Sequence, residues 1–191
     1  MSVPRGRYLV LVVTLVAATF GIATGCGGGD GDDDDPSPTC VSFVGAAAPA
    51  PSTVAVRSDA GGSCDQAVVE FVITDVADVY AVGADVTYDT DVVEFESLST
   101  AGSVLASDGA TLATQVKEPT AGTVTVGVGR VGATAGVTVN GTARLFRMTF
   151  RKVADSGTGA LSLSEEKVQN GEEPPETIPG VPWSGGTFRI Q

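Results

Sequence analysis

Histidine is missing altogether from the 191 residues of the chain. Its absence excludes catalytic triads of the Ser-His-Asp kind and removes the commonest metal ligand. Glu94 with Glu96, or Asp89 with Asp91, could in principle supply the carboxylate pair of a glycosidase, but exposed acidic residues reach such spacings routinely. Because no nucleophile and base form a recognisable constellation, the sequence predicts no catalytic residue, no metal site and no cofactor, and therefore not an enzyme.

Basic residues are also scarce, since 11 Lys and Arg stand against 23 Asp and Glu, for a formal net charge of −12. A nucleic-acid partner requires a clustered basic surface, so the charge argues against one. Four of the cations, Arg144, Arg147, Arg151 and Lys152, nevertheless lie within nine residues. Two interpretations are open: a solvated outer sheet face whose long side chains cover apolar surface, or a patch that binds a partner.

Long apolar runs are few, and the clearest covers residues 8–20, directly after Arg5 and Arg7. A bilayer span requires about 20 apolar residues, so this run predicts a cleaved signal peptide rather than a membrane helix. The stretch Ile22-Ala23-Thr24-Gly25-Cys26 resembles the lipobox of bacterial lipoproteins, with Ala23 where that motif most often has leucine. The resemblance implies a lipoprotein signal peptide at residues 1–25 and lipidation of Cys26.

Cysteine occurs only three times. An odd thiol is awkward in an exported protein, and lipid on Cys26 leaves Cys40 and Cys64 as a natural disulfide pair in an oxidising compartment. The alternative is an ordinary signal peptide followed by a free or disulfide-bonded cysteine. The residue after Cys26 is Gly27 and not an aspartate, which favours onward export to the outer membrane. We therefore expect an exported chain that is lipid-anchored to the outer membrane or the cell surface.

Residues 26–39 are rich in Gly, Asp and Pro, a composition that cannot bury a core. They predict a flexible tether that holds the rest of the chain away from the membrane. Calcium binding by the aspartates is the alternative, but their spacing lacks the ordered ligands, central glycine and closing glutamate of a calcium loop. The remaining residues, 40–191, are enough for one domain with its own core.

Short segments rich in Val, Thr and Phe recur between Gly, Asp, Ser and Pro clusters throughout this domain, whereas helical periodicity is scarce. The pattern predicts an all-β fold of two packed sheets, a sandwich or a jelly roll. The expected strands are residues 54–57, 68–74, 81–88, 92–98, 111–117, 123–130, 143–153, 160–168 and 187–190.

Alternation of side chains along a strand predicts which residues point inward and which outward. In the strand at 81–88, one face carries Val82, Ala84, Val86 and Tyr88 and the other carries Ala81, Gly83, Asp85 and Thr87. In the strand at 143–153, Phe146, Met148 and Phe150 are expected inward, and Arg147, Thr149 and Arg151 outward.

Two of these segments resemble the cohesin family, the β-sandwich receptors that hold dockerin-bearing enzymes in cellulosomes. Residues 79–94, Val-Tyr-Ala-Val-Gly-Ala-Asp-Val-Thr-Tyr-Asp-Thr-Asp-Val-Val-Glu, are similar to the family's apolar strand running into Tyr-Asp-Pro-x-Val-Leu-Glu, with Thr90 in place of the proline. Residues 141–150 resemble a late cohesin strand that ends in a Thr-Phe pair, and residues 159–163 resemble the strand that follows it. The likeness runs in order over residues 53–190.

The resemblance implies a single nine-stranded jelly-roll β-sandwich of cohesin type and a non-catalytic role, the capture of a dockerin-like protein module at the cell envelope. It also implies partner contacts on the outward face of one sheet holding both segments. On that basis the partner-binding residues would be Ala81, Gly83, Asp85, Thr87, Arg147, Thr149 and Arg151. Gly83 stands where several cohesins carry a polar contact residue, which departs from the family's usual interface.

Two other functions stay open at this point. The domain could be a carbohydrate-binding module of related sandwich shape that serves polysaccharide attachment and catabolism, or a structural envelope lipoprotein. Trp183, the only tryptophan, lies in a loop before the last strand. It would either stack on a sugar ring or pack over the end of the sandwich.

Overall fold

The computed structural model of the chain describes residues 39–45, 49–132 and 135–191. The signal peptide predicted at 1–25, the lipidation site Cys26 and all of the tether except Thr39 lie outside the described residues. Residues Ser37–Gln191 form one compact unit that contains every strand. Within the described part, no helix is both long and apolar enough to cross a membrane.

The described residues form eleven strands and one short 3-10 helix, η1 (Val104–Ala106). All nine strands predicted from the sequence are present, together with β1 and β10. The strands are β1 (Val41–Gly45), β2 (Thr53–Asp59), β3 (Gln66–Thr74), β4 (Ala81–Tyr88), β5 (Val93–Ser99), β6 (Leu112–Thr120), β7 (Thr123–Arg130), β8 (Thr142–Lys152), β9 (Gly157–Gln169), β10 (Trp183–Ser184) and β11 (Gly186–Ile190).

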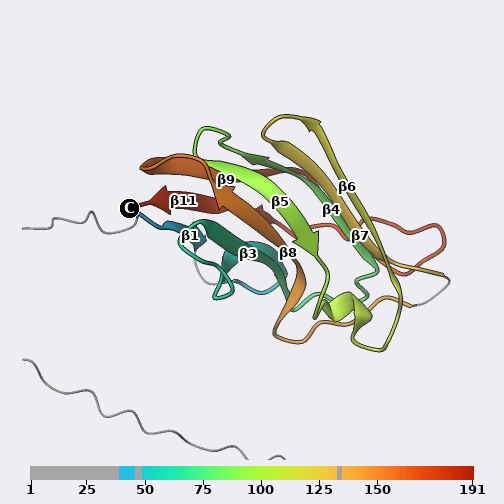
Figure 1. Ribbon diagram of the computed structural model, residues 1–191. Coiled ribbons are helices and arrows are strands. Elements are labelled where there is room, and N and C mark those ends of the chain that lie inside the picture. Colours follow the sequence, from blue (N-terminus) through green and yellow to red (C-terminus); the bar gives the residue numbers. More distant parts are fainter. Residues whose placement is uncertain (1–38, 46–48, 133–134) are drawn as a thin grey trace, which may run out of the picture. The chain divides into compact units, whose positions relative to one another are not determined.

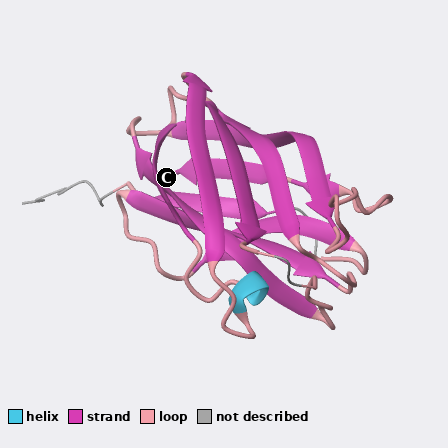
Figure 2. Cartoon of the chain, turned by 90° about the vertical axis from the view of Figure 1, so that its right-hand side faces the viewer, coloured by secondary structure: helices cyan, strands magenta, loops and turns pink. Residues whose placement is uncertain are grey.

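The strands pack as two layers, which confirms the all-β sandwich predicted from the sequence (Figures 1 and 2). A six-stranded sheet has the order β1-β11-β9-β4-β7-β6, and a five-stranded sheet has the order β10-β2-β3-β8-β5. We call them the β4 sheet and the β8 sheet. The nearly continuous apolar strand β3 pairs with β2 on one side and β8 on the other, as its lack of alternation predicts for an interior strand.

Aromatic rings from both sheets fill the space between the layers. Phe71 of β3 stacks on Phe146 of β8 with ring centroids 4.4 Å apart, and Phe150 of β8 meets Phe188 of β11 at 4.9 Å. The second contact joins the two sheets directly. All four side chains are fully buried, and each contributes about 1.5–3 kcal/mol by removal of its surface from water.

The two strands that carry the predicted binding residues alternate as expected. In β4, Val82, Ala84, Val86 and Tyr88 are buried, and in β8, Phe146, Met148 and Phe150 are fully buried. The intervening residues therefore point away from the core, which fixes the outward face of each sheet.

The disulfide predicted between Cys40 and Cys64 is present. It links Cys40, directly before β1, to Cys64, between β2 and β3. Separate backbone hydrogen bonds hold Cys40 beside Gln191, because each amide donates to the carbonyl of the other residue. The Lys152 ammonium also donates to the Thr39 carbonyl oxygen at 2.8 Å. The point where the predicted tether joins the domain is thus fixed to both sheets.

Candidate partner-binding surface

The predicted binding residues lie on two different faces. Ala81, Gly83, Asp85 and Thr87 point outward from the β4 sheet, whereas Arg147, Thr149 and Arg151 point outward from the β8 sheet. The expectation that both groups share one sheet is wrong. Alternation along a strand tells which side chains leave the core, but sheet membership depends on pairing between strands that are distant in sequence, and β4 pairs with β7 and β9 while β8 pairs with β3 and β5.

An ion-pair network occupies the outward face of the β8 sheet. The buried carboxylate of Glu70 accepts from Arg57 Nε at 2.5 Å and from Arg144 Nε at 2.7 Å. Asp59 Oδ2 lies 3.1 Å from the Arg144 guanidinium and 3.7 Å from that of Arg147. The cations of this face are therefore neutralised by carboxylates of their own sheet, which favours a solvated structural surface over a basic docking patch.

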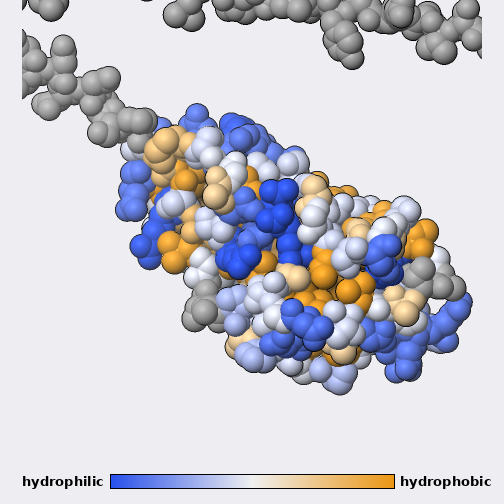
Figure 3. All heavy atoms as spheres, turned by 90° about the horizontal axis from the view of Figure 1, so that it is seen from below, coloured by the Kyte–Doolittle hydropathy of each residue, from blue (hydrophilic) through white to orange (hydrophobic). Residues whose placement is uncertain are grey.

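The same face continues to β5, where Arg151 forms ion pairs with Glu94 and, at 3.6 Å, with Glu96. Glu96 also accepts a hydrogen bond from the Gln66 side chain at 2.7 Å. The two glutamates considered above as a glycosidase pair thus bind an arginine across the sheet. On the side of the domain where β1 and β3 lie, seen from below, hydrophilic residues gather in clusters between hydrophobic ones (Figure 3).

The outward face of the β4 sheet has a different character, because its central positions carry almost no side chain. In one cross-strand row, Gly83 of β4 lies beside Gly127 of β7, and in the next row Ala81 lies beside Gly129. Ala113 of β6 extends the second row. These five small residues form the floor of a shallow groove of about 480 Å³, which we call the glycine trough.

Longer side chains stand on both sides of the glycine trough. Lys167 and Gln169 of β9 flank it beside β4, and Gln115 of β6 flanks it beside β7. One end is closed by the next row, where the Thr125 hydroxyl donates to the Asp85 carboxylate at 2.6 Å. The trough is therefore a bounded depression on an exposed sheet face, of the size that a side chain or a helical ridge from another molecule fills.

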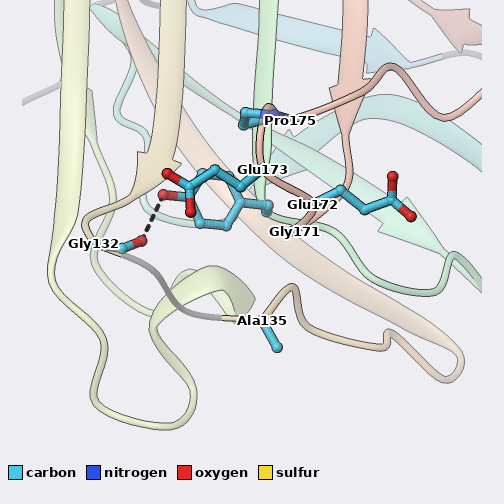
Figure 4. Close-up of a pocket in the computed structure, with 7 residues that line it drawn as sticks. Gly132, Ala135, Gly171, Glu172, Glu173 and Pro175 are labelled. Carbon is cyan, nitrogen blue, oxygen red and sulfur yellow. Dashed lines mark hydrogen bonds between the residues drawn. The ribbon is translucent and has the colours of Figure 1, made fainter.

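A second cavity, of about 580 Å³, lies among the loops at the end of the sandwich. The Tyr80 ring lines it, with the phenol donating to the Gly132 carbonyl at 2.9 Å, and Glu172 and Glu173 lie around it (Figure 4). The Asp78 carboxylate accepts from the Gly171 amide and so holds one wall in place. Of the described residues that line this cavity, two are glutamates, and the one aromatic side chain, Tyr80, is hydrogen-bonded to the backbone.

Trp183 lies in β10, which pairs with β2, and its partly buried side chain packs against the hydrophobic core. Of the two roles considered for this residue, the structure supports packing at the sandwich edge. Among the described residues, no group of three or more His, Cys, Asp or Glu side chains is arranged to hold a metal ion.

Comparison with known proteins gives structural neighbours only. No protein-family model and no curated protein matches the chain. The second type II cohesin module of the adaptor ScaA scaffoldin from Acetivibrio cellulolyticus superposes with a TM-score of 0.55 and 12% identity, covering 78% of this chain and 88% of that one.

Two further cohesins superpose similarly. The sixth cohesin of Acetivibrio cellulolyticus scaffoldin B, solved in complex with a Cel5 dockerin, gives a TM-score of 0.52 at 12% identity, with 79% and 97% of the two chains covered. CaCohA2 from Clostridium acetobutylicum gives 0.52 at 17% identity, with 78% and 88% covered. At such identities the likeness establishes the fold. The described part of the chain is therefore a cohesin-like β-sandwich domain.

Proposed function

We propose that the protein is an exported lipoprotein, anchored to the cell envelope by lipid on Cys26, whose sandwich domain is a non-catalytic module that captures a dockerin-like protein partner. The glycine trough on the outward face of the β4 sheet is the observation that carries the proposal. It is a bounded, exposed depression whose floor consists of glycine and alanine residues. The polar side chains of Gln115, Lys167 and Gln169 stand at its sides and do not cover it.

The other outward face is poorly suited to the same role. Its arginines already have carboxylate partners within the sheet, so a docking protein would have to displace those ion pairs and desolvate them. The β4 face requires no such displacement. Solved neighbours of the same fold include one in complex with a Cel5 dockerin, which supports a protein ligand of that kind.

Polysaccharide binding is the less favoured function. Sugar-binding sheets present aromatic rings to the sugar faces, and Trp183, the one tryptophan, packs against the core. The domain thereby loses its main candidate for stacking on a glycan.

The test is capture of a partner by residues 37–191, which form a compact unit, from secreted and envelope proteins of the source organism. Calcium is present during capture and a chelator is used for release, because a partner whose fold depends on calcium-binding loops would lose that fold when the metal is removed. The key variant is Gly127→Arg, since a Cβ at Gly127 meets only Gln115 Cβ, at 3.7 Å, and the added side chain blocks the trough. Thr149→Arg adds the same side chain to the opposite face as a matched control.

We expect the wild type and Thr149→Arg to capture one discrete protein that chelator releases, and Gly127→Arg to lose it. Capture that survives Gly127→Arg but fails with Thr149→Arg would move the site to the β8 sheet and refute the proposal. Retention of glycans, with no protein captured by the folded domain, would favour the polysaccharide alternative.

Anchoring is tested separately by metabolic labelling with a radioactive or clickable palmitate. The wild-type chain should incorporate the label and fractionate with membranes, whereas Cys26→Ser should do neither. Equal labelling of the two chains would exclude lipid attachment at this cysteine.

A further inference from the structure

Contacts from three parts of the domain meet where the predicted tether joins it. The disulfide connects Cys40 to Cys64 in the β2–β3 loop, and backbone hydrogen bonds connect Cys40 to Gln191. The Lys152 ammonium, at the end of β8, donates to the Thr39 carbonyl oxygen at 2.8 Å. The last residue of the tether and the first residue after it are thus held by side chains and backbone that are distant in sequence.

The strand that follows the tether, β1, is by itself a weak attachment. It has five residues, lies at the edge of the β4 sheet and pairs only with β11. Val41 and Phe43 are its only buried side chains. Terminal elements with few buried contacts open at a much lower free energy than the whole domain. A domain held through β1 alone would therefore be detached by the opening of one short strand.

The disulfide connects the tether to a far more stable element. Cys64 lies two residues before β3, the interior strand whose nine residues pair with both β2 and β8. The Cys64 loop is itself held in place, because Ser63 and Gln66 exchange backbone hydrogen bonds and the Lys152 amide donates to the Asp65 carbonyl at 2.8 Å. The covalent route from the tether thus reaches the middle of the β8 sheet without passing through β1 or β2.

The segment that this route bypasses includes an exposed loop between β1 and β2. Ala50, Pro51 and Ser52 of this loop are all exposed. Exposed loops of small and polar residues are preferred sites of proteolytic cleavage. A cut between Ala50 and Pro51 would separate the tether and β1 from the rest of the backbone, but Cys40 would still be bonded to Cys64.

We propose that the Cys40–Cys64 disulfide is a strap that fastens the tether directly to β3, so that the domain stays attached when β1 opens or when the β1–β2 loop is cut. The inference rests on the proposed function, because attachment matters only if Cys26 is anchored. It assigns the disulfide a role in attachment that is separate from its contribution to folding stability.

The test uses residues 26–191 with the recognition site of a sequence-specific protease inserted between Ala50 and Pro51. After oxidative folding, the free thiol of Cys26 is coupled to maleimide beads through a thioether, which reductant does not break. The loop is cut, the beads are washed, and the C-terminal fragment is quantified on the beads and in the wash. Half of each sample receives reductant after the cut.

We expect less than about 10% of the fragment in the wash of the oxidised sample, because the strap still joins it to the bead. After reduction the fragment is held only by the five residue pairs between β1 and β11, so washing should release roughly tenfold more of it. The uncut chain should stay on the beads with or without reductant, since its backbone is continuous.

A matched control carries the same protease site between Gly28 and Gly29 of the predicted tether. Cutting there should release the domain in both redox states, because the strap lies on the domain side of the cut. The double variant Cys40→Ser, Cys64→Ser with the loop site should release the fragment without reductant. Since reductant is added to the folded wild-type sequence only after the cut, the test does not depend on whether the double variant folds.

Release of the fragment from the oxidised, cut chain would overturn the inference, and so would its retention after reduction and washing, which would show that β1 alone holds the domain. The beads replace the membrane, so failure of the strap is distinct from failure of the proposed anchoring. If Cys26→Ser does not alter palmitate labelling while the beads give the expected pattern, the lipid proposal fails and the strap remains.

Discussion

Replacing Glu70 by glutamine should destabilise the domain by about 2 kcal/mol. Glu70 is 5% exposed and its two oxygens accept from Arg57 and Arg144, so the substitution removes the charge that two guanidinium groups share. Breaking a fully buried ion pair costs about 3–5 kcal/mol, and an exposed pair about 0–1 kcal/mol. The arginine side chains are 48% and 29% exposed and can be rehydrated, which places the expected cost between those limits.

The assay is urea unfolding of residues 37–191, with the wild type, Glu70→Gln, Arg144→Met and the double variant forming a cycle. We expect a coupling free energy of about 1 kcal/mol between Glu70 and Arg144, because they are in direct contact. Glu94→Gln is the control: its pair with Arg151 is about half exposed on both sides, so the change should stay within about 0.5 kcal/mol. Equal effects of the two substitutions would refute the view that Glu70 organises the outer face of the β8 sheet.

Replacing Cys40 and Cys64 by alanine opens a loop with a sequence separation of 24 and should cost about 3 kcal/mol in the same urea assay; a loss below about 1 kcal/mol would contradict this. Burial, followed by the hydrogen bond to Glu118, raises the pKa of Tyr88 to about 12, above the usual value of about 10. The native state thus holds this proton more tightly, so its stabilisation is full below pH 10 and is lost as the pH rises from about 10 toward 12. The melting temperature of Tyr88→Phe should fall less steeply over that window, and identical slopes would exclude the effect. Gly127→Val should stabilise the domain by about 0.5–1 kcal/mol, since glycine is unfavourable within a strand; destabilisation would show that the added side chain meets backbone it cannot displace.

Local patterns in the sequence were sufficient for much of the fold. Alternation placed Val82 and Val86 inward on β4 and Phe146 and Phe150 inward on β8, as the structure has them. The odd number of cysteines pointed to the Cys40–Cys64 disulfide. The alternation depends only on neighbours along the chain, and the cysteine pairing depends only on a residue count. Neither prediction therefore requires knowledge of the tertiary arrangement.

Features that depend on pairing between distant strands could not be obtained in this way. Alternation along each strand places Gly83 and Gly127 outward, but only the register of β4 with β7 makes them neighbours and so creates the trough. The strand β10 is two residues long, too short to show a period. Alternation also places Arg130 inward beside valines, and its guanidinium is accommodated there because it binds the Asp108 carboxylate and the Leu105 carbonyl.

The two outward faces use their residues in opposite ways. Long charged side chains on the β8 sheet bind one another and cover the sheet, which stabilises the domain and leaves few groups for a partner. Three glycines on β4 and β7 contribute no side-chain packing. At Gly127 a Cβ would be accommodated, so glycine there lowers strand stability by roughly 0.5–1 kcal/mol relative to alanine, whereas at Gly129 a Cβ would approach that of Ala81 to 3.0 Å. Glycine at position 127 therefore has no steric role in folding, and the trough is flanked by Lys167, which has no ion pair among the described residues. If the β4 sheet binds the partner as proposed, stability and partner binding depend on different sheets, and substitutions on one face should alter one property while leaving the other nearly unchanged.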